Sequence, residues 1–134
     1  MKEILDEESK NALINYRIQR AYETLKEAQV MMRESFYNAA VNRLYYACYY
    51  AAVSLLLKYD HQPQTHNGVK TMLGLHFIST GKLPIKIGKI FSTLFEKRHS
   101  GDYDDFVYCD KEMLDLYPQA ELFIHTINQL LKEE

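Results

Sequence analysis

Apolar residues recur along much of this chain at alternating spacings of four and three, which place side chains on one face of an α-helix. The first such run predicts a helix over residues 9 to 34, with a Lys/Glu/Gln exterior. Its apolar stripe consists of Ile14, Ile18, Ala21, Leu25, Ala28 and Met32. No segment shows sustained alternation of apolar and polar residues, so the sequence does not predict a β-sheet.

The next predicted helix, residues 36 to 59, is apolar or aromatic on every side. We expect Ser35 to be its N-cap, because a serine hydroxyl can accept a hydrogen bond from an otherwise unsatisfied backbone N–H. Arg43 is the only charged side chain between Ser35 and Leu57. Since a helix that is hydrophobic all round is packed all round, this segment should form the centre of the fold.

Turn-forming residues separate this helix from the next two. The segment DHQPQTHNG, residues 60 to 68, predicts a loop in which Thr65 caps a short helix that ends before Gly81. Pro84 should open the following helix, because the first turn does not use the N–H that proline lacks. The buried stripe of that helix is predicted to be Ile87, Phe91 and Leu94.

The run SGDYDDF, residues 100 to 106, interrupts the helical periodicity, and Asp110 is well placed to cap a final helix. The apolar stripe of that helix comprises Met113, Tyr117, Ala120, Ile124, Ile127 and Leu131. Pro118 lies within this pattern and should kink or split the helix. We therefore predict one all-α domain over residues 1 to 134, an up-and-down antiparallel bundle of four long helices and one short helix.

Composition and charge narrow the possible partners. The chain is 47% hydrophobic and 25% charged, as is typical of globular proteins, and its net charge of -2 argues against broad nucleic-acid binding through a basic surface. Cys48 and Cys109 follow no CxxC spacing, and no charged-then-apolar leader opens the chain, which favours a cytoplasmic protein with free thiols. The longest uncharged apolar stretch, residues 44 to 57, is too short for a membrane span, which needs about 20 residues.

Arg98 extends the predicted stripe of Ile87, Phe91 and Leu94 by one helical step, so its charge is directed toward the core. In a structural interpretation, Arg98 and Arg43 pair with the nearby aspartates at positions 102, 104 and 105. In a functional interpretation, the two arginines belong to a polar cluster that binds nucleotide or RNA phosphate. The candidate residues of this cluster are Arg43, Arg98, His99, Asp102 and Tyr103. Both interpretations remain open.

Other chemistry has weaker support in the sequence. Glu96 and His99 have the Glu-x-x-His spacing of di-metal bundles, but a second such motif is missing, so we predict no metal site and no cofactor. His61, His66 and His76 are scattered and are expected to be surface or capping residues. The tyrosines Tyr45, Tyr46, Tyr49 and Tyr50 form two i,i+4 pairs, for which core packing is favoured over stacking on nucleic-acid bases.

Three segments together carry a family resemblance: AVNRLYYACYYAAVSLLL (residues 40 to 57), THNGVKTMLGLHFISTGKLP (residues 65 to 84) and LFEKRHSGDYDDF (residues 94 to 106). In this order they resemble the HEPN domains of bacteria and archaea. The resemblance implies a helical bundle that dimerises. Such domains are often encoded beside a minimal nucleotidyltransferase, in many cases as a toxin–antitoxin pair.

In the ribonuclease branch of this family, four to six residues separate an arginine from a histidine, and two such motifs meet across the dimer to cut RNA without metal. Carried onto this chain, the motif places Arg98 at the arginine, but Tyr103, Asp104 and Asp105 stand where the histidine is expected. The other arginines tested, Arg17, Arg20, Arg33 and Arg43, also have no histidine at that distance. Because tyrosine and carboxylate side chains titrate far from neutrality, they are poor substitutes for imidazole.

The sequence thus favours a homodimeric interaction module, outside the ribonuclease branch, that partners a nucleotidyltransferase and contacts nucleotide or RNA phosphate near Arg98. One alternative is a metal-independent ribonuclease toxin with a degenerate motif. Another is a purely structural oligomer, in which the arginines are paired internally.

Overall fold

The computed structural model describes residues 5–103 and 110–133, with the backbone alone for residues 99–103 and 110. Its four long helices are α1 (Glu7–Arg33), α2 (Tyr37–Lys58), α4 (Ile85–Tyr103) and α5 (Asp110–Lys132). The short helix α3 (His66–Leu73) continues into a π-helical turn, η1 (Gly74–Ile78). No β-strand occurs in the described residues, so the predicted all-α bundle of four long helices and one short helix is confirmed.

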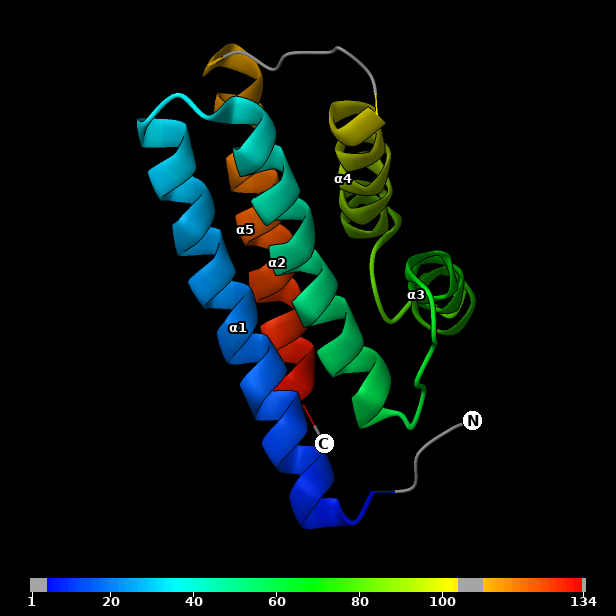
Figure 1. Ribbon diagram of the computed structural model, residues 1–134. Coiled ribbons are helices and arrows are strands. Elements are labelled where there is room, and N and C mark those ends of the chain that lie inside the picture. The colour runs from blue at the N-terminus through cyan, green and yellow to red at the C-terminus, as the bar shows by residue number, and fades with distance from the viewer. Residues whose placement is uncertain (1–4, 104–109, 134) are drawn as a thin grey trace.

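The long helices run alternately up and down, with α3 and η1 inserted between α2 and α4 (Figure 1). Helix α2 packs against α1, α3, α4 and α5, which confirms its predicted central position. More than half of its residues are buried. The small side chains of Ala40, Ala47 and Ala51 are completely covered, and small side chains of this kind allow neighbouring helices to approach closely.

The predicted stripes supply much of the remaining core. From α1 they contribute Ile14, Ala21, Leu25 and Ala28, from α4 Ile87, Phe91 and Leu94, and from α5 Met113, Ala120, Ile124 and Ile127. Among the described residues, no helix combines the length and the apolar character that crossing a bilayer requires. Cys48 is a free, buried thiol, whereas Cys109 lies outside the described residues.

Ser35 was expected to cap α2, and this prediction was wrong. The N-cap of α2 is Phe36, which makes no side-chain cap hydrogen bond. Ser35 instead ends α1 in the left-handed region, with a φ of 64°. Its N–H donates to the Met32 carbonyl at 3.0 Å, and that of Phe36 donates to the Met31 carbonyl at 2.8 Å. These two bonds form a Schellman motif, which satisfies the last carbonyls of α1 and turns the chain sharply into α2.

The connection from α2 to α4 agrees closely with what the sequence predicted. The Gly68 N–H donates to Thr65 Oγ1 at 2.9 Å, which confirms Thr65 as the cap of α3. Gly81 ends the connection with a φ of +81°, a left-handed conformation that glycine adopts without strain. Pro84 directly precedes α4, and its carbonyl accepts from the Ile87 N–H at 3.0 Å.

One prediction near the chain end needs correction. Helix α4 continues to Tyr103, so the run at residues 100 to 106 does not end the helix where the periodicity breaks. Helix α5 is described from Asp110 onward, so the capping role of Asp110 stays a prediction. Of the two outcomes predicted for Pro118, the helix does not split. Proline removes the hydrogen bond to the carbonyl four residues earlier, which belongs to Leu114. Because Leu114 is 72% exposed, water can satisfy that carbonyl.

Candidate functional site

Arg43 faces α1. Its Nη1 lies 3.3 Å from Glu27 Oε1, and its Nη2 donates to Asn42 Oδ1 at 3.0 Å. The guanidinium carbon lies 5.2 Å from the centre of the Tyr46 ring. The structural interpretation paired Arg43 with the aspartates that follow Arg98. The carboxylate that pairs with Arg43 is instead that of Glu27. Arg43 ties α2 to α1, and Arg98 contacts a different face of α2.

Arg98 lies against Tyr45, the largest completely buried aromatic side chain of α2. The guanidinium carbon of Arg98 is 4.9 Å from the centre of the Tyr45 ring, a cation–π contact. Two residues correspond to about 200° of helical rotation, so positions 43 and 45 point to nearly opposite sides of α2. The rings of Phe91 and Phe95 from α4 complete the surroundings of Tyr45. The aromatic residues therefore position Arg98 within the bundle.

His66 reaches the same tyrosine from α3. Its Nδ1 lies 2.6 Å from the Tyr45 hydroxyl, within hydrogen-bonding distance. The imidazole also stacks on Tyr49, with ring centres 4.4 Å apart and planes inclined by 19°. Thr65 starts α3 immediately before this histidine, so the helix cap sets where the imidazole enters the cluster. Arg98 and His66, 32 residues apart in sequence, thus both contact Tyr45.

Burial and charge fix the ionisation of this group. Burial strongly raises the pKa of Tyr45 above its usual value, an effect that the Arg98 charge opposes, so the phenol is neutral. Burial also lowers the pKa of His66, and the nearby Arg98 lowers it further. Because an unperturbed histidine titrates near 6.5, His66 is predominantly neutral at pH 7. A neutral imidazole can both accept and donate a hydrogen bond.

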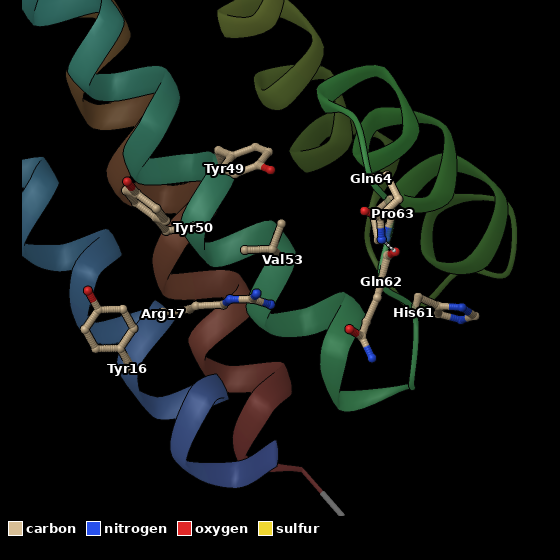
Figure 2. Close-up of a pocket in the computed structure, with 9 residues that line it drawn as sticks. All are labelled: Tyr16, Arg17, Tyr49, Tyr50, Val53, His61, Gln62, Pro63 and Gln64. Carbon is tan, nitrogen blue, oxygen red and sulfur yellow. Dashed lines mark hydrogen bonds between the residues drawn. The ribbon is translucent and has the colours of Figure 1, made fainter. Parts of the chain in front are cut away.

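A pocket of about 330 Å³ is lined in part by Tyr49. Its lining comes from α1, α2 and the connection that precedes α3, as Figure 2 shows. The residues concerned are Tyr16, Arg17, Tyr49, Tyr50, Val53, His61, Gln62, Pro63 and Gln64. Arg17 extends over α2 toward Val53 and residues 61–64 (Figure 2). The pocket therefore joins a cation to tyrosine rings and amide side chains.

Arg17 and Arg20 lie one turn apart on α1 but have different surroundings. Arg20 Nη1 lies 3.3 Å from Glu23 Oε1 and 3.5 Å from Glu27 Oε2, so two carboxylates offset its charge. For Arg17, no ion pair with a carboxylate is found in the described part of the chain. Burial lowers the pKa of Arg17, an effect that Tyr49 opposes, but an arginine stays protonated in proteins. The pocket thus contains a positive charge, and none of the described residues that line it is a carboxylate.

The other members of the predicted cluster cannot be placed as side chains. His99, Asp102 and Tyr103 belong to the last turns of α4, but their side chains lie outside the described residues. Asp104 and Asp105 lie outside them altogether. The Glu96–His99 spacing is therefore not tested. Among the residues described, no group of three or more His, Cys, Asp or Glu side chains could hold a metal ion.

Sequence reasoning missed His66 and Arg17. His66 was expected to be a surface or capping residue, although its place after the Thr65 cap fixed it in the first turn of α3. The sequence did not reveal that this turn faces Tyr45 and Tyr49. Arg17 was tested only as part of a ribonuclease motif. Its position between the apolar stripe and the exposed face was the available signal, because such residues border the neighbouring helix.

Comparisons with known proteins agree on one family. The HEPN domain model matches residues 14–130. The chain is 34% identical over 125 residues to a UPF0332 protein of Thermotoga maritima, covering 92% of this chain and 95% of the relative. It is 32% identical over 133 residues to "Putative toxin MJ0605" of Methanocaldococcus jannaschii, covering 99% and 98% respectively. Another relative from that organism, "Putative toxin MJ0142", is 30% identical over 108 residues, which are 81% of this chain and 69% of the relative. The chain therefore belongs to the HEPN domain family.

Proposed function

We propose that this protein is the toxin-like member of a two-protein system and that it binds the phosphate of a nucleotide or an RNA at the Arg98 end of α4. One observation carries the proposal: Arg98 from α4 and His66 from α3 both contact the buried Tyr45. A guanidinium can bind two phosphate oxygens at once, and a neutral imidazole adds one further hydrogen bond. This local charge is consistent with a chain whose net charge is -2.

The proposed site also includes the residues that the sequence places just beyond Arg98 on α4. These are His99, Asp102 and Tyr103, in the final turns of the helix. Arg43 serves in this proposal as a structural residue, because its ion pair with Glu27 already supplies a partner. The two arginines therefore make a matched pair for experiment.

Isothermal titration calorimetry with ATP and with a short RNA tests the site. Wild-type protein should bind one or both, and Arg98→Ala should weaken binding at least tenfold, since a hydrogen bond to a charged group contributes about 1.5–3 kcal/mol. Arg43→Ala should retain the wild-type affinity. Absence of binding by the wild type, or equal losses in the two variants, would refute the proposed site.

The partner proposed for this protein is a minimal nucleotidyltransferase. Two relatives carry the word toxin in their names, and a toxin requires a protein that neutralises it. Affinity purification of this protein from its native host, followed by mass spectrometry, should recover a nucleotidyltransferase in stoichiometric amount. Recovery of the protein without such a partner would contradict this part of the proposal.

We further place a homodimer interface on the α4–α5 face. A groove of about 340 Å³ lies there, and its lining includes Ile90, Pro118 and Leu122, the last 44% exposed. Leu122→Glu should shift the sedimentation velocity from dimer to monomer, because a buried unpaired charge is costly. Leu75→Glu, at a 61% exposed position on η1, is the control and should stay dimeric. A dimeric Leu122→Glu protein or a monomeric wild type would reject this interface.

RNA cleavage is a second candidate function, and the position of His66 favours it. The sequence motif lacks a histidine, but the fold brings this imidazole to the tyrosine that Arg98 contacts. A neutral imidazole is suited to general acid–base catalysis near pH 7. Purified protein should then cleave RNA in the presence of EDTA, and both Arg98→Ala and His66→Ala should abolish cleavage. Activity that survives both changes would indicate a contaminating nuclease.

A further inference from the structure

We infer that the site binds a single-stranded nucleic acid of at least two nucleotides, with a second phosphate held by Arg17 in the pocket between α1, α2 and residues 61–64. This inference rests on the phosphate site proposed at Arg98 and extends it. It depends on a continuous series of side chains that joins the two arginines.

The series has a cation at each end and aromatic rings between them. Arg98 contacts Tyr45, the Tyr45 hydroxyl contacts His66, and the His66 ring stacks on Tyr49. Tyr49 then lines the same pocket as Arg17. Tyr45 is completely buried and serves as a support, whereas His66 and Tyr49 are half-buried and present part of their rings to the surface. The two cations are therefore separated by an aromatic surface that carries no charge at pH 7.

This pattern fits the chemistry of a single strand. Proteins that bind single-stranded nucleic acids combine cations along the backbone with aromatic side chains on which the bases stack. A mononucleotide has one phosphate group and can satisfy only one of the two arginines at a time. A duplex keeps its bases paired and stacked inside the helix, so its bases cannot stack on these rings.

The Arg17 pocket has the features of a phosphate and base subsite. Arg17 is half-buried, and none of the described residues that line its pocket is a carboxylate, so a phosphate would not have to displace one there. Tyr16, at the edge of the same pocket, is 59% exposed and offers a ring for stacking. The volume of about 330 Å³ falls within the usual range for small-ligand pockets.

Fluorescence anisotropy with labelled tetranucleotides, competed by unlabelled AMP, tests the inference. We expect wild-type protein to bind single-stranded RNA at least tenfold more tightly than AMP. Arg17→Ala should weaken tetranucleotide binding about tenfold to a hundredfold while changing AMP binding less than twofold. Arg33→Ala is the matched control, because it removes an exposed arginine from the last turn of the same helix, and Arg33 does not line the pocket. It should bind like the wild type.

Two further measurements extend this test, one of the salt dependence of Arg17→Ala and one of a second variant, Tyr16→Ala. Each phosphate contact contributes a slope of about −0.7 to the logarithm of affinity against the logarithm of salt concentration, so Arg17→Ala should reduce the slope by about 0.7. Tyr16→Ala, which changes an exposed side chain, should weaken tetranucleotide binding about fivefold to a hundredfold through lost stacking. Parallel titrations with single-stranded DNA show whether the strand must be RNA, and both results support a strand site.

The outcomes separate the two proposals. If Arg98→Ala weakens binding and Arg17→Ala does not, the second phosphate position is wrong and the Arg98 site stands. Duplex RNA that binds as tightly as the single strand also overturns the strand inference. If wild-type protein binds neither AMP nor a tetranucleotide, the Arg98 site fails, and the inference built on it fails as well.

Discussion

Two pairs of arginines in this bundle are held by different sets of contacts. Arg20 and Arg43 share Glu27 at the contact between α1 and α2, where its two carboxylate oxygens lie 3.5 and 3.3 Å from the guanidinium nitrogens. Arg98 instead contacts the ring of Tyr45, and Arg17 lines a pocket with Tyr49. Arg20 and Arg43 also contact tyrosine rings, those of Tyr50 and Tyr46, so the shared carboxylate of Glu27 is what distinguishes the first pair. The first pair forms a carboxylate seam and the second an aromatic site.

The difference shows how one charge type serves two purposes. A carboxylate offsets the charge of a guanidinium, and the ion pair then helps to hold two helices together. A tyrosine ring attracts a guanidinium through its π-face but carries no net charge, so this contact orients the cation without cancelling it. Because the phenol rings add no negative charge, the aromatic site can orient a guanidinium for recognition of a phosphate.

The largest expected effect comes from removing the support of the aromatic site. Tyr45→Ala should reduce the free energy of unfolding by about 3–5 kcal/mol, because it leaves a cavity in the core and removes the ring that contacts Arg98. Tyr45→Phe should lose only about 0.5–1.5 kcal/mol, the contribution of the hydrogen bond to His66. Urea denaturation followed by circular dichroism measures both values. A Tyr45→Ala protein as stable as Tyr45→Phe would show that the ring is not a packing centre.

Arg98→Met separates the structural interpretation of that arginine from the functional one. If Arg98 mainly binds a ligand, the variant should lose at least tenfold in nucleotide or RNA affinity and about 1–2 kcal/mol in stability, the value of a partly buried cation–π contact. Methionine keeps much of the side-chain volume, so cavity formation is small. A loss of about 3–5 kcal/mol with unchanged affinity would instead identify a buried ion pair, as the structural interpretation requires.

His66 gives the aromatic site a pH dependence that the carboxylate seam does not share. Because the pKa of His66 is lowered by burial and by Arg98, the unfolded chain binds this proton at a higher pH than the folded chain. Folding stability should therefore be fully present above pH 6.5 and decline as the pH falls below it. His66→Gln should show a smaller decline between pH 7 and pH 5 in urea titrations. Identical pH profiles would mean that the histidine is not perturbed.

The fold was more predictable from the sequence than the candidate site. Periodicity identified the buried stripes, and the single charge between Ser35 and Leu57 identified the central helix, because both are patterns within one segment. Thr65 was predictable as a cap for the same reason, whereas Ser35 was not, since serine serves local hydrogen bonding at both helix ends. The meeting of His66 with Tyr45 depends on how α3 crosses α2. That contact joins residues distant in sequence and has no local pattern.

The smallest effect should come from the carboxylate seam itself. Glu27→Gln removes the charge shared by Arg20 and Arg43, and all three side chains are partly exposed. The variant should lose only about 0.2–1 kcal/mol of stability, and the loss should shrink in 1 M salt, where the screening length falls to about 3 Å. Its affinity for nucleotide or RNA should match the wild type. A threefold or larger change in that affinity would mean that the arginines of the seam also serve the site, and the two arginine pairs would then no longer be functionally distinct.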